Sequence, residues 1–408
     1  MSNFRKRQIQ RENIDADVRL ENGGQTLVAD YANGDADISE LEKQVEGEVT
    51  ILAEGEVLEQ DTETVEQFED KLEDEEVEVS EAEAETISIA TEGIANRWGI
   101  TPSRKLKREN FGRDRKDNRT MAREAITDTL KDMWETFVEW IKSLWDGARE
   151  IWKKYVNAGK SLVKQSETNS KVIDALGEKK KETIKGGFIK QLSEGKEFIG
   201  SDVAKMNAIG TQYTDIRLLE TVANETEKAA AAEVTDAKAK ETVEAAVETA
   251  VSETDKATKE MQPILGGEHV EVKTKGGEAG LSVTFAFKAV DKGDLADEVP
   301  TPDTSKLAEV NDYMGDFGKE LEKFVNKFRT VESSRKKVLD GLEKSKKAAS
   351  KGAESAEEKA AARAIKRGIT VLVTTMGNVE KVAHKSRTNL AKGLSGYVRA
   401  GIAAYGKE

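Results

Sequence analysis

The chain has 408 residues, of which 37% are hydrophobic and 35% charged, with no Cys, two His and a formal net charge of -14. This length predicts two or three structural units, and so polar a composition disfavours a large globular enzyme built on one thick core. The lack of Cys excludes disulfides and zinc-thiolate sites, and no apolar run reaches the roughly 20 residues of a membrane-spanning helix.

The first segment is strongly acidic: residues 12–92 hold 28 Asp or Glu against three Lys or Arg. Its stretch EQFEDKLEDEEVEVSEAEAE has few large apolar residues and no sustained period, so it buries too little surface to offset the entropy of ordering it. We therefore expect residues 1–92 to be largely disordered. Such a run is commonly a solubilising tail, but its abrupt end at Glu92 favours a more specific role.

That end is a sharp reversal of charge between Glu92 and Gly93. Small residues at the edge of an accessible segment are favoured sites of proteolysis. The sequence therefore predicts a cleavage site at Ala90, Thr91, Glu92 and Gly93, which would make residues 1–92 an acidic propeptide.

A basic segment follows at 93–123, with ten Lys or Arg against three acids and with Trp98 and Phe111 among them. Basic side chains interleaved with aromatic rings suit nucleic-acid phosphates and bases. The candidate DNA-binding residues are Arg97, Arg104, Lys105, Lys107, Arg108, Arg113, Arg115 and Lys116. The alternative is a basic linker that pairs with the neighbouring acidic segment, and both hold if that segment masks the basic one until it is removed.

Residues 124–166 have a clear helical period, with apolar residues every three or four positions and four of the five Trp of the chain. An amphipathic helix of this kind either binds a membrane surface or a partner, or packs on its own protein. We favour packing, because such stripes usually belong to a core.

Four features follow one another in the chain: an acidic leader, the junction ATEG with its RWG stretch, a basic patch and the helix MWETFVEWIKSLWDGAREIWKKY. Over residues 80–165 this arrangement resembles the internal head proteins of large tailed bacteriophages. The resemblance implies a propeptide that directs the chain into the prohead core and is removed by a prohead protease after Glu. The family's cleavage pattern is a small or aliphatic residue, any residue and Glu, which Ala90, Thr91 and Glu92 match. Other triplets also match, and the charge boundary selects Glu92.

The rest of the chain is predicted to be mostly helical. Residues 167–265 are Ala-rich, and 266–292 alternate around GGEAG as a β-hairpin that should pack on helices or on a second molecule. Residues 346–408 form basic helices with an apolar side and an opposite basic side, which is a second candidate surface for DNA phosphates. Residues 304–345 carry a heptad seam with one charged defect, Arg335, which predicts a coiled coil. Its partner is either another copy or the Ala-rich helix between Thr221 and Met261 folded back against it, which we favour, with the hairpin at their shared tip.

Together these patterns predict a mainly α fold, an elongated helical bundle or coiled coil with a small β-hairpin and a disordered acidic N-terminal segment. No catalytic constellation, metal site or cofactor motif is recognisable, so we expect no enzyme, no cofactor and no small-molecule substrate. The leading function is a phage internal head protein, found in the host cytoplasm before assembly and then in the virion interior. Its partners would be non-specific double-stranded DNA, the prohead protease, other head proteins and a further copy of itself. The alternatives are a helical pore-forming or membrane-perturbing protein and a cytosolic coiled-coil scaffold.

Overall fold

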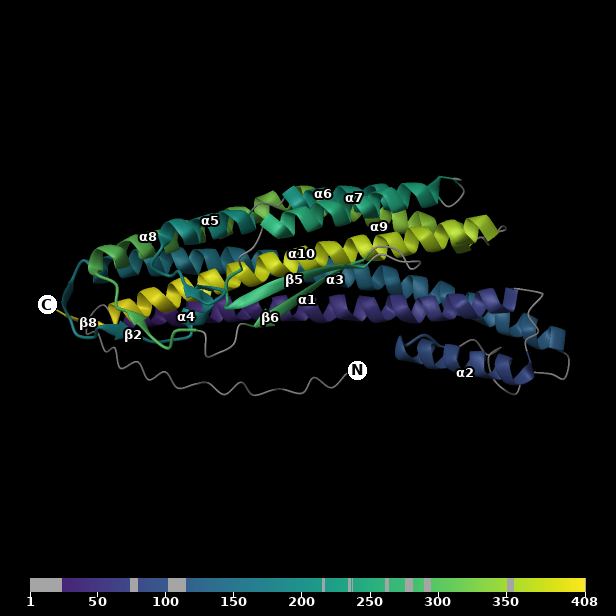
Figure 1. Ribbon diagram of the computed structural model, residues 1–408, viewed down its shortest axis with the longest axis horizontal. Helices are drawn as coiled ribbons and strands as arrows, with labels where there is room; N and C mark the ends of the chain where they lie inside the picture. The colour runs from purple at the N-terminus through teal and green to yellow at the C-terminus, as the bar shows by residue number, and fades with distance from the viewer. Residues whose placement is uncertain are drawn as a thin grey trace.

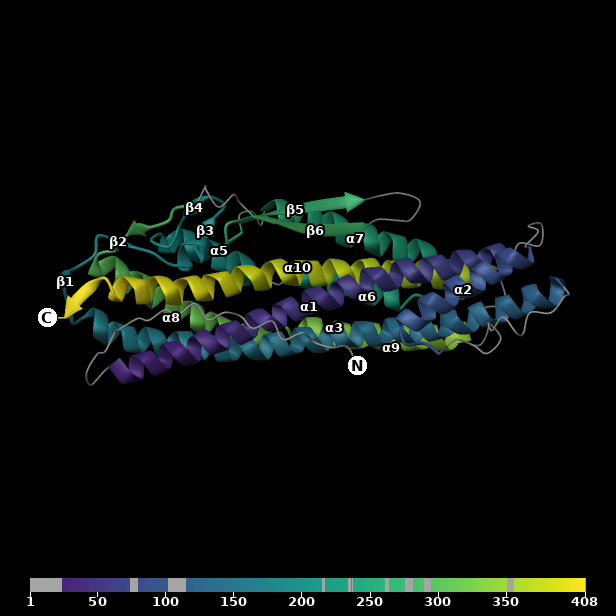
Figure 2. The ribbon, with the colours of Figure 1, turned by 90° about the horizontal axis from the view of Figure 1, so that it is seen from below.

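The computed structural model describes residues 24–73, 80–101, 115–214, 217–233, 236, 238–260, 264–275, 282–289, 295–350 and 356–407. They form an elongated bundle of long helices, which confirms the predicted mainly α fold (Figures 1 and 2). Its helices are α1 (Gly24–Glu73), α2 (Glu81–Arg97), α3 (Arg115–Ile173), α4 (Phe188–Gln191), α5 (Val203–Thr214), α6 (Arg217–Ala230), α7 (Ala239–Glu260), α8 (Thr304–Lys327), α9 (Arg329–Ser350) and α10 (Ala356–Ile402).

The strands are short and pair only two by two in the described part of the chain. They are β1 (Leu176–Lys179), β2 (Thr183–Ile184), β3 (Ser193–Glu194), β4 (Glu197–Phe198), β5 (Glu268–Lys275), β6 (Ser282–Ala289), β7 (Val299–Pro300) and β8 (Tyr405–Lys407). The pairs β1–β8 and β2–β7 are antiparallel, and they join the segment after α3 to the end of α10 and to the start of α8 at one end of the bundle (Figure 1).

The acidic N-terminal segment differs from our expectation, because residues 24–73 form the 50-residue helix α1 and residues 81–97 form α2. Residues 1–23 lie outside the described residues. The order of α1 comes from tertiary packing: a sparse row of aliphatic side chains, spaced by three to seven residues, is buried against α3 and α10. The buried residues of this row are Ile38, Leu41, Val45, Leu52, Leu58, Val65 and Leu72.

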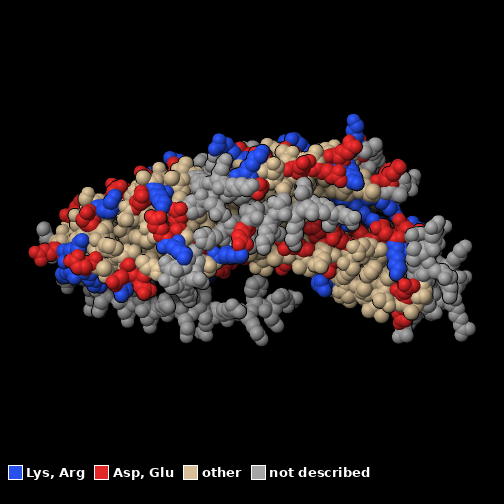
Figure 3. Space-filling model, in the orientation of Figure 1, with Lys and Arg blue, Asp and Glu red and all other residues tan. Residues whose placement is uncertain are grey.

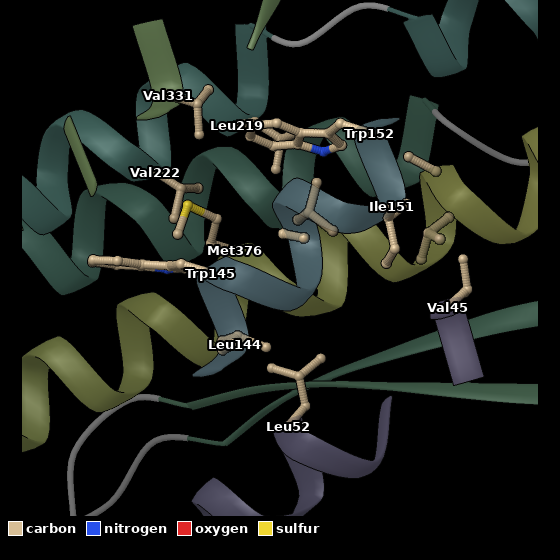
Figure 4. Close-up of a cluster of buried hydrophobic side chains, with 14 of the residues drawn as sticks. Val45, Leu52, Leu144, Trp145, Ile151, Trp152, Leu219, Val222, Val331 and Met376 are labelled. Carbon is tan, nitrogen blue, oxygen red and sulfur yellow. The ribbon is translucent and has the colours of Figure 1, made fainter. Parts of the chain in front are cut away.

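The Trp-rich helix is the 59-residue α3, and its apolar stripe packs within the protein, as we favoured. Trp140, Trp145 and Trp152 are buried. Figure 4 shows Leu144, Trp145, Ile151 and Trp152 of α3 surrounded by side chains from four other helices. Those partners are Val45 and Leu52 of α1, Leu219 and Val222 of α6, Val331 of α9 and Met376 of α10.

The heptad seam is buried along its whole length, from Leu307 to Leu342, but its helix differs from the prediction, and so does the partner of its first half. The helix is interrupted at Phe328 into α8 and α9, and α8 packs on α3 while α9 packs on α6. The Ala-rich stretch is likewise broken, and its second helix, α7, packs on α10 and α6. Aromatic residues of α3 cover the large residues of the seam: Phe328 packs on Trp152 with tilted rings whose centroids are 3.8 Å apart, and Phe324 meets Tyr155 edge-on at 5.7 Å.

A close approach of α3 and α8 needs glycine on both helices. A Cβ on Gly159 would lie 2.5 Å from the carbonyl oxygen of Gly318, and a Cβ on Gly318 would lie 2.7 Å from the carbonyl oxygen of Gly159. Neither contact is sterically allowed, so the two glycines set the distance between these helices at this level of the bundle.

The predicted β-hairpin is present as β5 and β6, which pair antiparallel with Val272 opposite Phe285. It lies alongside α10 and α7 rather than at a tip shared by α7 and α8 (Figure 2). Two further segments differ from the prediction. Residues 176–198 contain β1 to β4 and α4, although this stretch was expected to be helical. In the basic C-terminal region, where we expected several helices, residues 356–402 form the single 47-residue helix α10.

Candidate processing site and DNA-binding surface

The predicted cleavage site lies inside α2, whose N-terminus has a complete capping box. The Ser80 hydroxyl accepts a hydrogen bond from the backbone N–H of Glu83 at 3.3 Å, and the Glu83 carboxylate accepts one from the backbone N–H of Ser80 at 3.0 Å. The helix ends where Gly99 adopts a φ of 70° and the N–H of Ile100 donates to the carbonyl of Ala95 at 2.9 Å.

Within α2 the four junction residues differ in their exposure. Thr91 is fully buried and Ala90 is half-buried, whereas Glu92 and Gly93 are exposed, and a Cβ on Gly93 would meet no atom within 4 Å. The bond between Glu92 and Gly93 is therefore on the solvent side of a helix rather than in the flexible segment that we expected. The capping box, together with the packing of Ile87 and Ile94 into the core, keeps this stretch helical.

The predicted DNA-binding residues are only partly described. Arg97 donates two hydrogen bonds to the Asp61 carboxylate of α1, at 2.9 and 2.8 Å, and the Trp98 indole N–H donates to the same carboxylate at 2.8 Å. Arg115 and Lys116 begin α3, but their side chains are not described. The other five residues, Arg104, Lys105, Lys107, Arg108 and Arg113, lie outside the described residues. Arg97 thus pairs with the acidic segment, as the masking hypothesis expects.

Sequence reasoning missed a second and longer set of such pairs, between α1 and α10. The two helices run antiparallel, and acidic side chains of α1 face Lys and Arg of α10 in two stretches, at residues 35–42 and 63–73 of α1; we call these contacts the charge ladder. Its pairs are Asp35–Arg399 at 2.8 Å, Glu42–Lys392 at 2.7 Å, Glu63–Arg367 at 3.4 Å, Glu66–Lys366 at 3.8 Å, Glu66–Arg367 at 3.6 Å, Glu69–Arg363 at 2.9 Å, Asp70–Arg363 at 2.7 Å, and Glu73–Lys359.

The ladder corrects our view of the C-terminal helix. We expected its basic residues to form an exposed side opposite its apolar side. Instead much of this side faces α1, and Lys366 is so buried that desolvation lowers its pKa. The signal available in the sequence was the opposite charge of the two segments, but charge alone does not say which basic segment the acids meet.

A buried polar cluster lies between the same helices and α9. Arg335, the charged defect of the heptad seam, donates a 2.6 Å hydrogen bond to Glu380, and its guanidinium lies 5.0 Å from the ring centroid of Trp152. The Tyr155 hydroxyl and His384 Nδ1 are 2.8 Å apart, and Glu48 of α1 lies 3.7 Å from His384 Nε2.

Burial controls the charge of this cluster. Desolvation raises the pKa of Glu48 and lowers the pKa of His384, so both groups favour their neutral forms. The cluster is closed to solvent, since its six side chains are at most 5% exposed. It can fix the register of α1, α3, α9 and α10, but no substrate can reach it.

Two general features of the described residues bear on function. They contain no group of three or more His, Asp or Glu placed to hold a metal ion. Among the helices of the described part, none is long and apolar enough to cross a membrane.

The fold and these surfaces define a non-globular helical protein in which an acidic helix covers a basic one. The chain belongs to the phiKZ-like phage internal head proteins, whose family model matches residues 34–400. This confirms the resemblance seen at residues 80–165 and extends it to nearly the whole chain. The protein is therefore a structural component located inside a phage head. Comparison with curated proteins and with solved structures gives no match.

Proposed function

We propose that this internal head protein is made as a precursor, cut by a prohead protease between Glu92 and Gly93, and packaged with double-stranded DNA. One observation carries the proposal: two oppositely charged parts of one chain face each other along the bundle, and the exposed Glu92 and Gly93 lie in the segment that connects them. A cut at this position separates the acidic part covalently from the basic part.

The helical conformation of the site sets a condition on the cut. Proteases bind their substrates extended, so part of α2 has to unwind before the bond is accessible, and short helices with one buried face open locally at modest cost. Because Gly93 is an exposed residue inside a helix, where glycine is unfavourable, the helix is weakened at the scissile bond itself.

DNA would be bound through phosphates, without sequence preference, by the basic segment 93–123 and by Lys and Arg elsewhere on the mature chain. In this function the protein is not an enzyme and needs no cofactor or small-molecule substrate. It would occur in the host cytoplasm before assembly, and would contact the protease, other head proteins and further copies of itself in the prohead.

The test is the N-terminal residue of the chain recovered from purified phage particles, which we expect to be Gly93. A Glu92→Gln variant should stay uncut in particles. The matched control is Glu54→Gln, which alters the same triplet pattern within α1 and should leave the cut unchanged. A chain from mature particles that still carries residues 1–92 would overturn the processing step.

A further inference from the structure

The exposed ion pairs of the charge ladder contribute little to holding α1 in place. Its members Asp35, Glu42, Asp70, Lys392 and Arg399 have side chains between 39% and 57% exposed, and ion pairs so exposed contribute at most about 1 kcal/mol each. The apolar row of α1 supplies the packing energy instead. At Gly55 the contact with α3 is so close that a Cβ would lie 2.0 Å from the Trp140 ring.

The acids of the ladder have a regular arrangement that suits another role. Asp35 and Glu42 are seven residues apart, and so are Glu63 and Asp70, which places each pair on one side of α1 with a spacing of about 10.5 Å. They present a row of carboxylates to a row of cations. On the face in Figure 3, Lys and Arg are accordingly interleaved with Asp and Glu rather than gathered in one basic patch.

The cations of the ladder are the kind that bind phosphate. Three of the six are Arg, whose planar guanidinium can make paired hydrogen bonds to carboxylate and phosphate alike. Arg363 already donates from Nη1 to both oxygens of Asp70, at 2.7 and 2.8 Å, and from Nη2 to Glu69 at 2.9 Å. Arg367, Lys392 and Arg399 are each 39% exposed, so solvent reaches them even with α1 in place. Their positive charge is cancelled by the acids, not hidden from solvent.

We propose that α1 is an internal substitute for DNA: its carboxylates occupy the basic row of α10 in the intact chain, and double-stranded DNA phosphates bind this row once those carboxylates are gone. This inference rests on the proposed function, because the proposed removal of residues 1–92 is the event that would take α1 away from α10. It adds a DNA-binding surface distinct from the segment 93–123 and a mechanism that keeps that surface inactive.

Cleavage alone does not complete this change. A cut between Glu92 and Gly93 breaks one peptide bond and none of the contacts of α1 with α3 and α10. Helix α1 therefore stays packed on these two helices until the cleaved fragment dissociates. For this reason the masking is tested by removing the charge of α1 and keeping its helix.

The experiment compares full-length chains in a DNA-binding titration with a duplex of random sequence at several salt concentrations. The test variant combines Asp35→Asn, Glu42→Gln, Glu63→Gln and Asp70→Asn, which keep side-chain size. We expect the dissociation constant at low salt to fall on the order of tenfold or more, and the log-log salt slope to steepen by about 0.9 for each freed cation that reaches a phosphate.

A control with the same change in net charge replaces Glu46, Glu54, Glu241 and Glu248 by Gln; these four exposed acids make no ion pair with α10 among the described residues. It should show little of the gain. Adding Arg363→Gln, Arg367→Gln, Lys392→Gln and Arg399→Gln to the test variant should abolish the gain. Each half of the test variant should give part of the gain in affinity. These two double variants are Asp35→Asn with Glu42→Gln and Glu63→Gln with Asp70→Asn, and they replace the fourfold variant if it does not fold.

An equal gain in test and control variants would overturn the proposal, because net charge would then explain it. Binding by the unmodified chain with no gain in the test variants would overturn the masking alone and leave the DNA packaging of the proposed function. Absence of DNA binding by every variant would overturn both.

Discussion

Arg335 of α9 and Glu380 of α10 form a buried ion pair, with 2.6 Å between the guanidinium and the carboxylate and side chains only 5% and 1% exposed. The pair lies at the one charged position of an otherwise apolar seam, and it links α9 to α10.

The first prediction concerns this pair. Arg335→Met leaves the Glu380 carboxylate buried without its cation, so we expect a loss of about 3–5 kcal/mol in the free energy of unfolding, measured by urea denaturation. The double variant Arg335→Met with Glu380→Leu removes both charges and should recover most of this loss. An Arg335→Met chain that unfolds at the same urea concentration as the unmodified chain would show that the pair is solvated in solution.

The second prediction is a pH dependence centred on Glu59 of α1. Burial, assisted by the nearby Glu63, raises the pKa of Glu59 from 4.5 to about 7. Between these values the folded chain holds a proton that the unfolded chain has released, so this group's contribution to stability falls as pH rises from about 4.5 to 7 and is constant above that range.

Glu59→Gln removes the dependence. Relative to the unmodified chain, the variant should gain up to about 3 kcal/mol in unfolding free energy on going from pH 4.5 to pH 8. Denaturant unfolding at both pH values measures the gain, and Glu54→Gln, an exposed acid of the same helix, controls for net charge. The same difference for both variants would mean that burial of Glu59 is not its cause.

The third prediction tests the contact of α3 with α8. Gly318→Ala places a methyl group against the backbone of Gly159, and forcing the helices apart should cost about 1–3 kcal/mol, although alanine is intrinsically better than glycine in a helix by about 1 kcal/mol. In Gly47→Ala, where the new Cβ meets nothing within 4 Å, the intrinsic preference acts alone and should raise the melting temperature. If both variants were stabilised, the helices would be further apart than described here.

The fourth prediction connects helix α2 with cleavage. Ser80→Ala removes the N-cap hydrogen bond and should weaken α2 by about 1 kcal/mol, which raises the population of the unwound form severalfold. A Glu-specific endoprotease applied in limiting amount should then produce chains starting at Gly93 severalfold faster, as followed by mass spectrometry. Ser80→Asp keeps a capping side chain and should cleave at the original rate. Equal rates for all three chains would mean that the unwinding of α2 does not limit the cut.

The sequence alone determined which residues are buried wherever a period was strong. The seam from Leu307 to Leu342 and the stripe of α3 are both buried in the structure, because a period of about 3.5 fixes which side of a helix is apolar. The alternation at 266–292 likewise predicted the antiparallel pairing of β5 and β6. The processing residues could also be proposed from the charge boundary at Glu92, since charge is a local property of the chain.

Only the tertiary structure decided which surfaces meet. A heptad seam specifies an apolar partner but not its identity, so α8 packs on α3, whose aromatic residues cover Phe324 and Phe328, rather than on the Ala-rich helix. The helicity of α1 was likewise hidden in its sequence, because its aliphatic row is too sparse and its acids too many for an isolated helix to be stable. Burial of that row against α3 and α10 supplies the free energy that the acidic segment lacks by itself.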